Sequence, residues 1–202
     1  MKSESIIEFM KETEKFKTCE RTCRTTDVCR AESDAEHSWH LALFLMLFEN
    51  EFTGVDFLKL IKIALIHDLP EIYAGDTNPY RGDKKNKTQN ERIAAEKLFS
   101  GLPKDLRVSF SKLFDEYSDQ TSIEARIVKS ADKLMPLIQN ICTNEKHSSY
   151  RKLEVNYREV EDYMDQFFQS EGILQNIYRK LLAESNSKGV FFPSNGDDLE
   201  ST

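Results

Sequence analysis

The sequence is poor in the residues that mark disulfide-rich scaffolds, turn-rich chains and membrane spans. It has four cysteines, five prolines and seven glycines among 202 residues. No run of 18 apolar residues occurs, so we expect no transmembrane helix. The opening segment, Met1 to Ser5, leads into mixed charge rather than an apolar run, which predicts no secretory signal. We therefore expect a cytoplasmic protein, whose few thiols would be reduced.

Positive charge is also in deficit, because the formal net charge is −7. A protein that binds duplex nucleic acid normally presents a basic stripe, so this balance argues against such a partner. The length is enough for one large domain with a substantial hydrophobic core.

Helical periodicity runs through nearly the whole chain, with no strand pattern, internal repeat or linker. We expect an all-α, single-domain helical bundle over residues 1–184 and a flexible C-terminal tail over 185–202. The expected helices begin near Ile6, at Ser33 or Asp34, at about Asp56, near Thr88, after Pro103 and at Ser122, with two more over 149–169 and 171–184. Residues 18–32 and 75–87 are expected to form loops.

The doublet His67-Asp68 is the most informative feature of the chain, which has only four histidines. It lies at the end of an apolar helical segment, where a core helix would place neither residue type. Neighbouring helix residues are about 100° apart, so both side chains can lean toward one ion between them. A capping and hydrogen-bonding pair is the alternative interpretation.

Two further residues stand at suitable places for the same chemistry. His37 precedes His40 by three positions on a very apolar helix, where a polar patch needs a reason. The alternative interpretation is that both imidazoles simply form hydrogen bonds with carbonyl groups inside a buried helix. Asp132 lies within the strongest apolar helix, so it should be paired or metal-bound. Its alternative partners are the nearby cations Arg126, Lys129 and Lys133. Two imidazoles and two carboxylates form a mixed set that suits a divalent metal ion, as in many hydrolases.

Taken together, these motifs resemble the HD-domain superfamily of metal-dependent phosphohydrolases, whose pattern is H…HD…D on a helical bundle. The resemblance spans about residues 5–180, and within the superfamily the chain looks like the branch similar to bacterial 5′-deoxynucleotidases and their uncharacterised relatives. It is carried by Arg21, Arg30, the run AEHSWH at 35–40, the run HDLPEIYAGDT at 67–77, and residues 124–137.

The resemblance implies one divalent metal ion as cofactor, held by His37, His67, Asp68 and Asp132. A second ion is not expected, because only His40 and His147 remain as further imidazoles. The metal could be Mn, Co, Fe, Ni, Zn or Mg, since a mixed His/Asp set discriminates poorly among them.

The resemblance also implies the catalytic residues and the substrate. Glu71 matches the acid/base carboxylate, and Asp76 matches a carboxylate that assists the leaving group. Arg21 would grip the substrate phosphate, with help from Arg30. The expected substrate is a small phosphoester, a nucleoside 5′-monophosphate, with Tyr80 available to stack on it.

Several alternatives stay open at this point. The substrate could be another phosphoester, or the chain could be a metal-binding regulatory protein without turnover, although Glu71 and Asp76 argue against that. A thiol-based zinc module could use Cys19, Cys23 and Cys29, but their spacing is wider than the Cys-x-x-Cys pairs of tight zinc sites.

A homodimer is expected from the resemblance and from aromatic residues in the last helices. Ordinary core packing is the alternative role of these side chains, which are Tyr157, Tyr163, Phe167, Phe168 and Tyr178.

Overall fold

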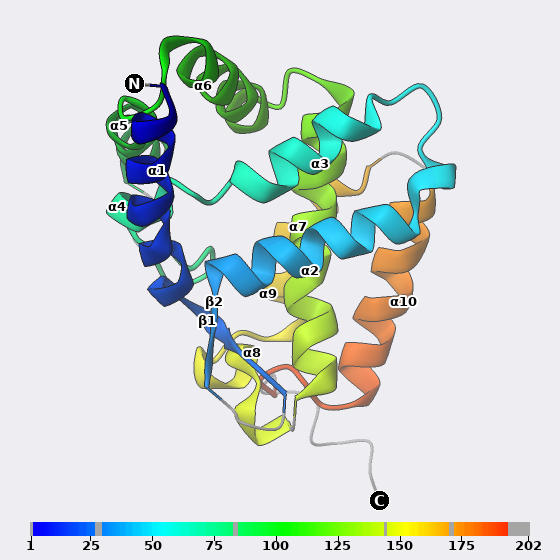
Figure 1. Cartoon of the computed structure of the whole chain (residues 1–202). Coiled ribbons are helices and arrows are strands. Elements are labelled where there is room, and N and C mark those ends of the chain that lie inside the picture. Colours follow the sequence, from blue (N-terminus) through cyan, green and yellow to red (C-terminus); the bar gives the residue numbers. More distant parts are fainter. Residues whose placement is uncertain (1, 27–29, 83–84, 144, 170–171, 194–202) are drawn as a thin grey trace, which may run out of the picture. The chain divides into compact units, whose positions relative to one another are not determined.

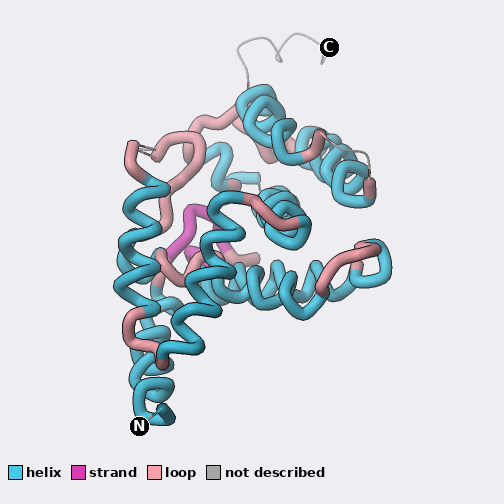
Figure 2. Tube along the Cα trace, turned by 90° about the horizontal axis from the view of Figure 1, so that it is seen from above, coloured by secondary structure: helices cyan, strands magenta, loops and turns pink. Residues whose placement is uncertain are grey.

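A computed structural model describes residues 2–26, 30–82, 85–143, 145–169 and 172–193 (Figure 1). Helices dominate these residues, and one short pair of strands lies among them (Figure 2). The expectation of an all-α chain is thus confirmed. The contacts between Cα atoms divide the chain into two compact units, Met1–Arg21 with Ser33–Ala131, and Thr22–Glu32 with Asp132–Thr202.

The first unit holds most of the helices that the periodicity predicts. In chain order they are α1 (Lys2–Thr13), η1 (Glu14–Thr18), α2 (Asp34–Leu47), η2 (Glu49–Glu51), α3 (Phe57–Ile66), α4 (Glu71–Ala74), α5 (Lys87–Phe99), α6 (Lys104–Asp119) and the start of α7 (Ile123–Cys142). Local signals set two of these starts. Asp56 caps α3 by accepting from the Lys59 N–H, and Ser33 caps α2.

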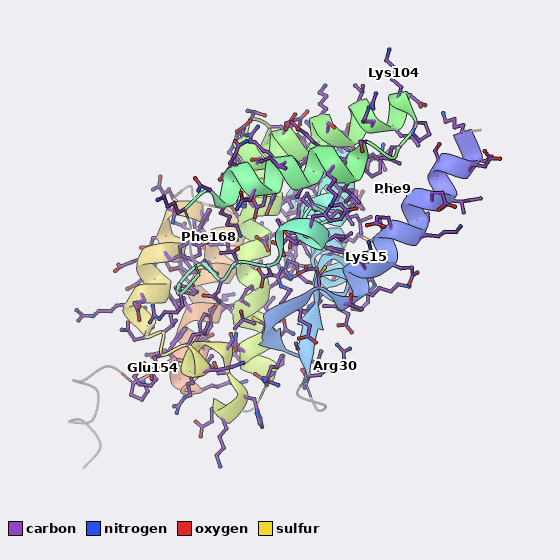
Figure 3. The ribbon with its side chains drawn as sticks, turned by 90° about the vertical axis from the view of Figure 1, so that its left-hand side faces the viewer. Phe9, Lys15, Arg30, Lys104, Glu154 and Phe168 are labelled. Atoms are coloured by element: carbon purple, nitrogen blue, oxygen red, sulfur yellow. The ribbon has the colours of Figure 1, made fainter. Side chains whose placement is uncertain are left out.

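The hydrophobic core of the first unit gathers around aromatic rings from three helices. Phe99 is fully buried and meets Phe110 and Phe114 edge to face, with ring centroids 5.7 Å and 6.3 Å apart. Phe9, which Figure 3 labels on α1, belongs to the same cluster. Ile66 and Leu69 also join it, so the core anchors the chain on both sides of the His67-Asp68 doublet.

Two strands replace the loop that was expected over residues 18–32. They are β1 (Glu20–Arg24) and β2 (Ala31–Ser33), and they pair as a two-stranded sheet. The Thr25 N–H donates to the Arg30 carbonyl at 2.9 Å, and the Asp34 N–H donates to the Cys19 carbonyl at 3.0 Å. Strands this short offer too few positions for an alternating pattern to be recognised, so the loop prediction was wrong.

The second unit contains η3 (Glu145–His147), α8 (Ser149–Lys152), α9 (Tyr157–Met164), η4 (Asp165–Phe167) and α10 (Ile173–Ser187). The helix predicted over 149–169 is therefore broken into shorter pieces. Glu154 has a positive φ of 54°, which ends the first turn, and Asn156 starts α9 with a capping box. The helix after residue 171 is present as α10.

Packed structure continues past the expected boundary at residue 184. The boundary falls inside α10, where Ser185 is buried, and Val190 beyond the helix is buried as well. The Ser148 hydroxyl donates to the Val190 carbonyl at 2.7 Å and fixes this end. Residues 194–202 lie outside the described residues, so a flexible tail remains a prediction for them. No described helix is long and apolar enough to cross a membrane.

Candidate metal centre

Two buried histidines face each other from neighbouring helices. His37 lies one turn into α2, whose register is fixed by the capping box between Ser33 and Glu36. His67 follows the last residue of α3, and the two imidazole centroids are 5.6 Å apart. The His67 Nδ1 lies 2.9 Å from the Ala64 carbonyl oxygen. That bond favours the tautomer with the proton on Nδ1, which leaves Nε2 as a ligand atom.

Asp68 lies between the two imidazoles. Its Oδ2 is 3.0 Å from His67 Nε2 and 3.8 Å from His37 Nε2. Asp132, one residue beyond Ala131 on the continuous helix α7, completes a group whose ligand atoms all lie within 4.8 Å of one another. Two imidazole nitrogens and two carboxylate oxygens in a buried site match the donor set of a divalent cation. The structure thus brings together all four residues of the predicted ligand set.

Asp132 also contacts one of the cations that were its alternative partners. Lys133 Nζ is 2.7 Å from Asp132 Oδ2, so the predicted ion pair does form. A carboxylate has two oxygens, and one ion pair does not prevent the other oxygen from binding a metal. His40 stacks on Trp39 and belongs to no metal-binding group among the described residues.

An aromatic ring supports His67 from a third helix. Tyr117 on α6 is buried and meets the imidazole edge to face, with centroids 5.0 Å apart. Lys129 on α7 donates to the Tyr117 hydroxyl at 3.2 Å. This contact could not be predicted from the sequence, because no motif marks an aromatic residue that packs on a metal ligand.

A second group of carboxylates shares Asp68 with the first. Asp34, Asp68 and Glu71 each place an oxygen within 4.8 Å of the others. Glu71 opens the one-turn helix α4 directly after Pro70, and Gly75, at a φ of 75°, ends that helix. Glu71 is buried, and its Oε2 finds no hydrogen-bond partner among the described residues.

This crowding of acidic groups changes their protonation. Burial, followed by repulsion from Asp68 and Asp34, raises the pKa of Glu71 well above its usual value. Burial and the charge of Asp68 also raise the pKa of Asp34 to about 6, against the opposing effect of Arg21. Asp76, half-buried after Gly75, contributes to both shifts through its charge, which places it near the pair.

The two predicted arginines differ in their surroundings. Arg21 on β1 is largely buried and donates from Nη1 to Asp34 Oδ1 at 3.2 Å and to Asp68 Oδ2 at 3.0 Å. Arg30, labelled in Figure 3, is an exposed residue of the second unit and donates to the Ala31 carbonyl. Sequence reasoning had treated Asp34 only as a candidate helix cap, and so missed its contact with Arg21.

The thiol-based alternative gains little from the structure. Cys23 is buried, 3.6 Å from the Ser149 hydroxyl, and Cys29 lies outside the described residues. Burial raises the pKa of the Cys19 thiol to about 11, which disfavours the thiolate that a metal requires. Among the described residues, no group that could hold a metal includes a cysteine.

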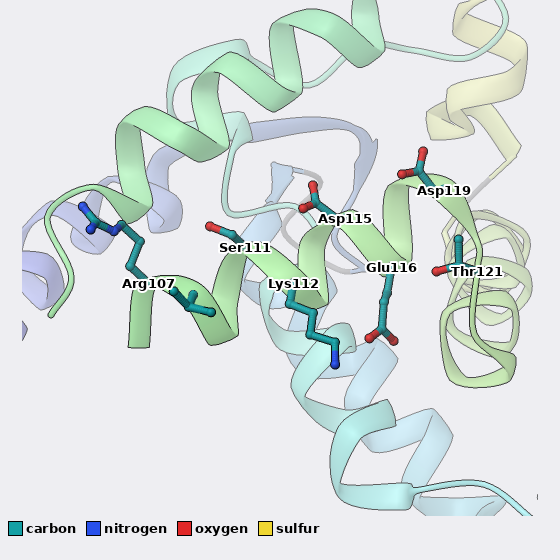
Figure 4. Close-up of a pocket in the computed structure, with 8 residues that line it drawn as sticks. Arg107, Ser111, Lys112, Asp115, Glu116, Asp119 and Thr121 are labelled. Atoms are coloured by element: carbon teal, nitrogen blue, oxygen red, sulfur yellow. The ribbon is translucent and has the colours of Figure 1, made fainter. Parts of the chain in front are cut away.

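A groove of about 470 Å³ follows the outer face of α6 (Figure 4). It contains none of the predicted site residues. Two of its carboxylates pair with cations elsewhere in the chain, because Glu116 bonds Lys59 at 2.6 Å and Asp119 bonds Arg92 at 2.6 Å. The groove is therefore best described as a solvated helix face.

A model of the HD domain family matches residues 13–173. The chain belongs to the HD domain family. This membership confirms the expected HD-domain fold and the expected class, a hydrolase of the HD phosphohydrolase superfamily.

Curated relatives and solved structures agree with that membership. The chain is 29% identical to the 5′-deoxynucleotidase HDDC2 of Homo sapiens, over 80% of this chain and 76% of that protein. Its identity to the protein of that name from Dictyostelium discoideum is 33%, over 67% and 75%. A crystal structure of a predicted metal-dependent phosphohydrolase from Magnetospirillum magnetotacticum MS-1 superimposes with a TM-score of 0.85 at 31% identity, covering 95% of this chain and 99% of that chain.

Proposed function

We propose that this HD-family protein hydrolyses nucleoside 5′-monophosphates, with deoxynucleotides as the first candidates. The observation that carries the proposal is the placement of Glu71 and Arg21 beside the His/Asp group, with Asp68 in contact with both sets. The names of the relatives in Homo sapiens and Dictyostelium discoideum support the same substrate class.

Four residues would hold the metal ion: His37, His67, Asp68 and Asp132. A bound divalent cation supplies Lewis-acid stabilisation of a phosphoryl oxygen and lowers the pKa of a coordinated water. The donor set favours no single metal among Mn, Co, Fe, Ni, Zn and Mg. We propose one ion per chain.

The remaining residues bind the phosphate and move protons. Arg21 offers a planar fork of N–H donors to the phosphate oxygens, and a lysine could not reproduce that fork. Glu71 orients the attacking water and takes its proton as the new P–O bond forms. The raised pKa of Glu71 makes its carboxylate a stronger proton acceptor than an ordinary glutamate, which suits a general base. Asp76 assists departure of the 5′ oxygen, and Arg30 is proposed as a weaker, peripheral phosphate contact.

The charges of the site favour a single terminal phosphate. Asp34, Asp68 and Glu71 lie together, and Arg21 contacts two of these three carboxylates, so we expect the further phosphates of a triphosphate to be repelled. The sequence has no Gly-rich cradle for a polyphosphate chain. Tyr80, half-buried in the loop after α4, is proposed to stack on the sugar or the base.

Two alternatives are less well supported. Hydrolysis of another phosphoester would use the same machinery, and only a substrate comparison separates it from the proposal. A metal-binding regulator without turnover would have no use for a buried Glu71 whose Oε2 has no hydrogen-bond partner among the described residues.

The test is phosphate release by the purified chain, stripped with chelator and reloaded with each candidate metal. Ribo- and deoxyribonucleoside monophosphates are compared with triphosphates and a generic phosphomonoester. We expect monophosphates to be hydrolysed far faster than triphosphates, and Arg21→Lys to raise KM sharply. Arg107→Lys, on the exposed face of α6, is the matched control. If no metal supports phosphate release from any monophosphate, the proposed function is refuted. If triphosphates are hydrolysed as fast as monophosphates, the proposed selectivity of the site for a single phosphate is refuted.

We also propose an oligomeric state and a cellular location. A homodimer rests on the family resemblance, because Phe168 and Tyr178, which had suggested it, stack on each other and are buried within the chain. Light scattering that gives a monomer mass at micromolar concentration would remove it. A cytoplasmic location is also proposed, and cell fractionation with antibody detection would test it.

A further inference from the structure

Asp34 is an unusual residue for its position. Its side chain is fully buried at the first position of α2, where most proteins would place a residue that can reach water. The positive end of the helix dipole compensates part of its charge. The remaining cost of burying a carboxylate requires a specific partner.

Backbone pairing places that partner beside it. The Asp34 N–H donates to the Cys19 carbonyl at 3.0 Å, which ties the start of α2 to the chain just before β1. Arg21 is two residues further on, and its Nη1 reaches Asp34 Oδ1 at 3.2 Å. The second oxygen, Asp34 Oδ2, is buried and has no hydrogen-bond partner among the described residues.

The two carboxylates that Arg21 contacts are not equivalent. Asp68 belongs to the His/Asp group, so a bound cation would compete with Arg21 for its oxygens. Asp34 is outside that four-residue group, and its Oδ2 has no hydrogen-bond partner among the described residues. A guanidinium has five N–H donors, so a bond to Asp34 leaves others for a phosphate.

We propose that Asp34 is a positioning residue that holds the Arg21 guanidinium in place for the substrate phosphate. This inference rests on the function proposed above. In this role Asp34 touches neither the reacting atoms nor the metal. It supplies the fixed anion that orients Arg21 when Asp68 is a ligand of the cation. Without the charge of Asp34, the guanidinium loses this contact and with it the orientation that directs its other N–H donors toward the phosphate.

The test uses Asp34→Asn, which keeps the shape of the side chain and removes its charge. Bound metal should stay at the wild-type level. The dissociation constant for inorganic phosphate, measured by calorimetry on the metal-loaded protein, should rise about 10- to 100-fold, the usual effect of losing a charged hydrogen bond. KM for a deoxynucleoside monophosphate should rise by a similar factor, with a smaller change in kcat. Asp105→Asn, an exposed acidic residue in the first turn of α6, is the matched control and should change neither.

A double-mutant cycle tests whether Asp34 acts through Arg21. In the Arg21→Lys background, adding Asp34→Asn should weaken phosphate binding no further. Additive effects would overturn the proposal, as would unchanged phosphate affinity in the single variant. Loss of metal from Asp34→Asn would overturn it too, because Asp34 would then be a ligand. If Asp34→Asn does not purify as a folded protein, Asp34→Ala is judged by the same criteria. Phosphate affinity can be measured without turnover, so this test stays separate from failure of the proposed nucleotidase activity.

Discussion

The metal-free protein should lose stability as the pH rises, because it buries carboxylates that resist ionisation. The pKa of Asp34 rises from 3.8 to about 6, mainly through burial and then through repulsion from Asp68. Between these two values the folded chain holds a proton that the unfolded chain has released. The free energy of unfolding therefore falls as the pH rises through this window, and no further loss from this residue follows above it. Glu71 acts in the same direction.

The magnitude follows from the size of the shift. A difference of about two pKa units corresponds to about 3 kcal/mol of unfolding free energy. For a chain of this length that amounts to a change of roughly 6 to 12 °C in Tm. The Asp34→Asn variant cannot ionise at this position, so it should gain this much relative to the wild type between about pH 4 and about pH 7.

The assay is thermal or urea unfolding of both proteins in excess chelator across that pH range. Asp105→Asn is the control. Lys2 lowers the pKa of that exposed carboxyl group, so removing its charge should give no gain in unfolding free energy as the pH rises. Added metal should stabilise the wild type at neutral pH by mass action. A difference between wild type and Asp34→Asn that does not change with pH, or that favours the wild type as the pH rises, would refute the reasoning.

Three further substitutions have defined outcomes. Glu71→Gln should keep the bound metal and lower kcat by about 10²- to 10⁴-fold, as metal analysis and initial rates will show; loss of metal would make Glu71 a ligand instead. Ser33→Ala removes the cap of α2 and should lower the free energy of unfolding by about 1 kcal/mol in urea titrations, and no change would mean the cap is dispensable. Phe99→Ala should cost about 3–5 kcal/mol in the same assay, since it empties the centre of the aromatic cluster, and a loss below about 1 kcal/mol would contradict that placement.

Local signals made much of the helical structure predictable. The start of α2 depends on a capping box between Ser33 and Glu36, and the spacing of three residues between them can be read directly from the sequence. Asp56 sets the start of α3 through a simpler cap, in which its side chain accepts a hydrogen bond from the Lys59 N–H. The two strands escaped because they are only five and three residues long. The break near Glu154 escaped because that residue takes a left-handed conformation without being glycine.

Some residues of the site could be predicted from the sequence and others could not. His37, His67, Asp68 and Asp132 could be proposed because the family motif records which residue types meet, even though three separate segments of the sequence supply them. Asp34 and Tyr117 could not, since their importance depends on burial and on contacts between elements that only the folded chain provides. An aspartate at a helix start or a tyrosine in an amphipathic helix has many ordinary explanations.

Titration of the metal-free protein with Mn²⁺, with phosphate release from a deoxynucleoside 5′-monophosphate as the readout, tests the central claim most directly. Activity should rise from the background and saturate at one bound ion per chain, and Asp68→Ala should show neither the bound ion nor the activity. Full activity in excess chelator, or an Asp68→Ala variant that still binds the ion and releases phosphate, would contradict the claim that the His/Asp group is the catalytic metal site.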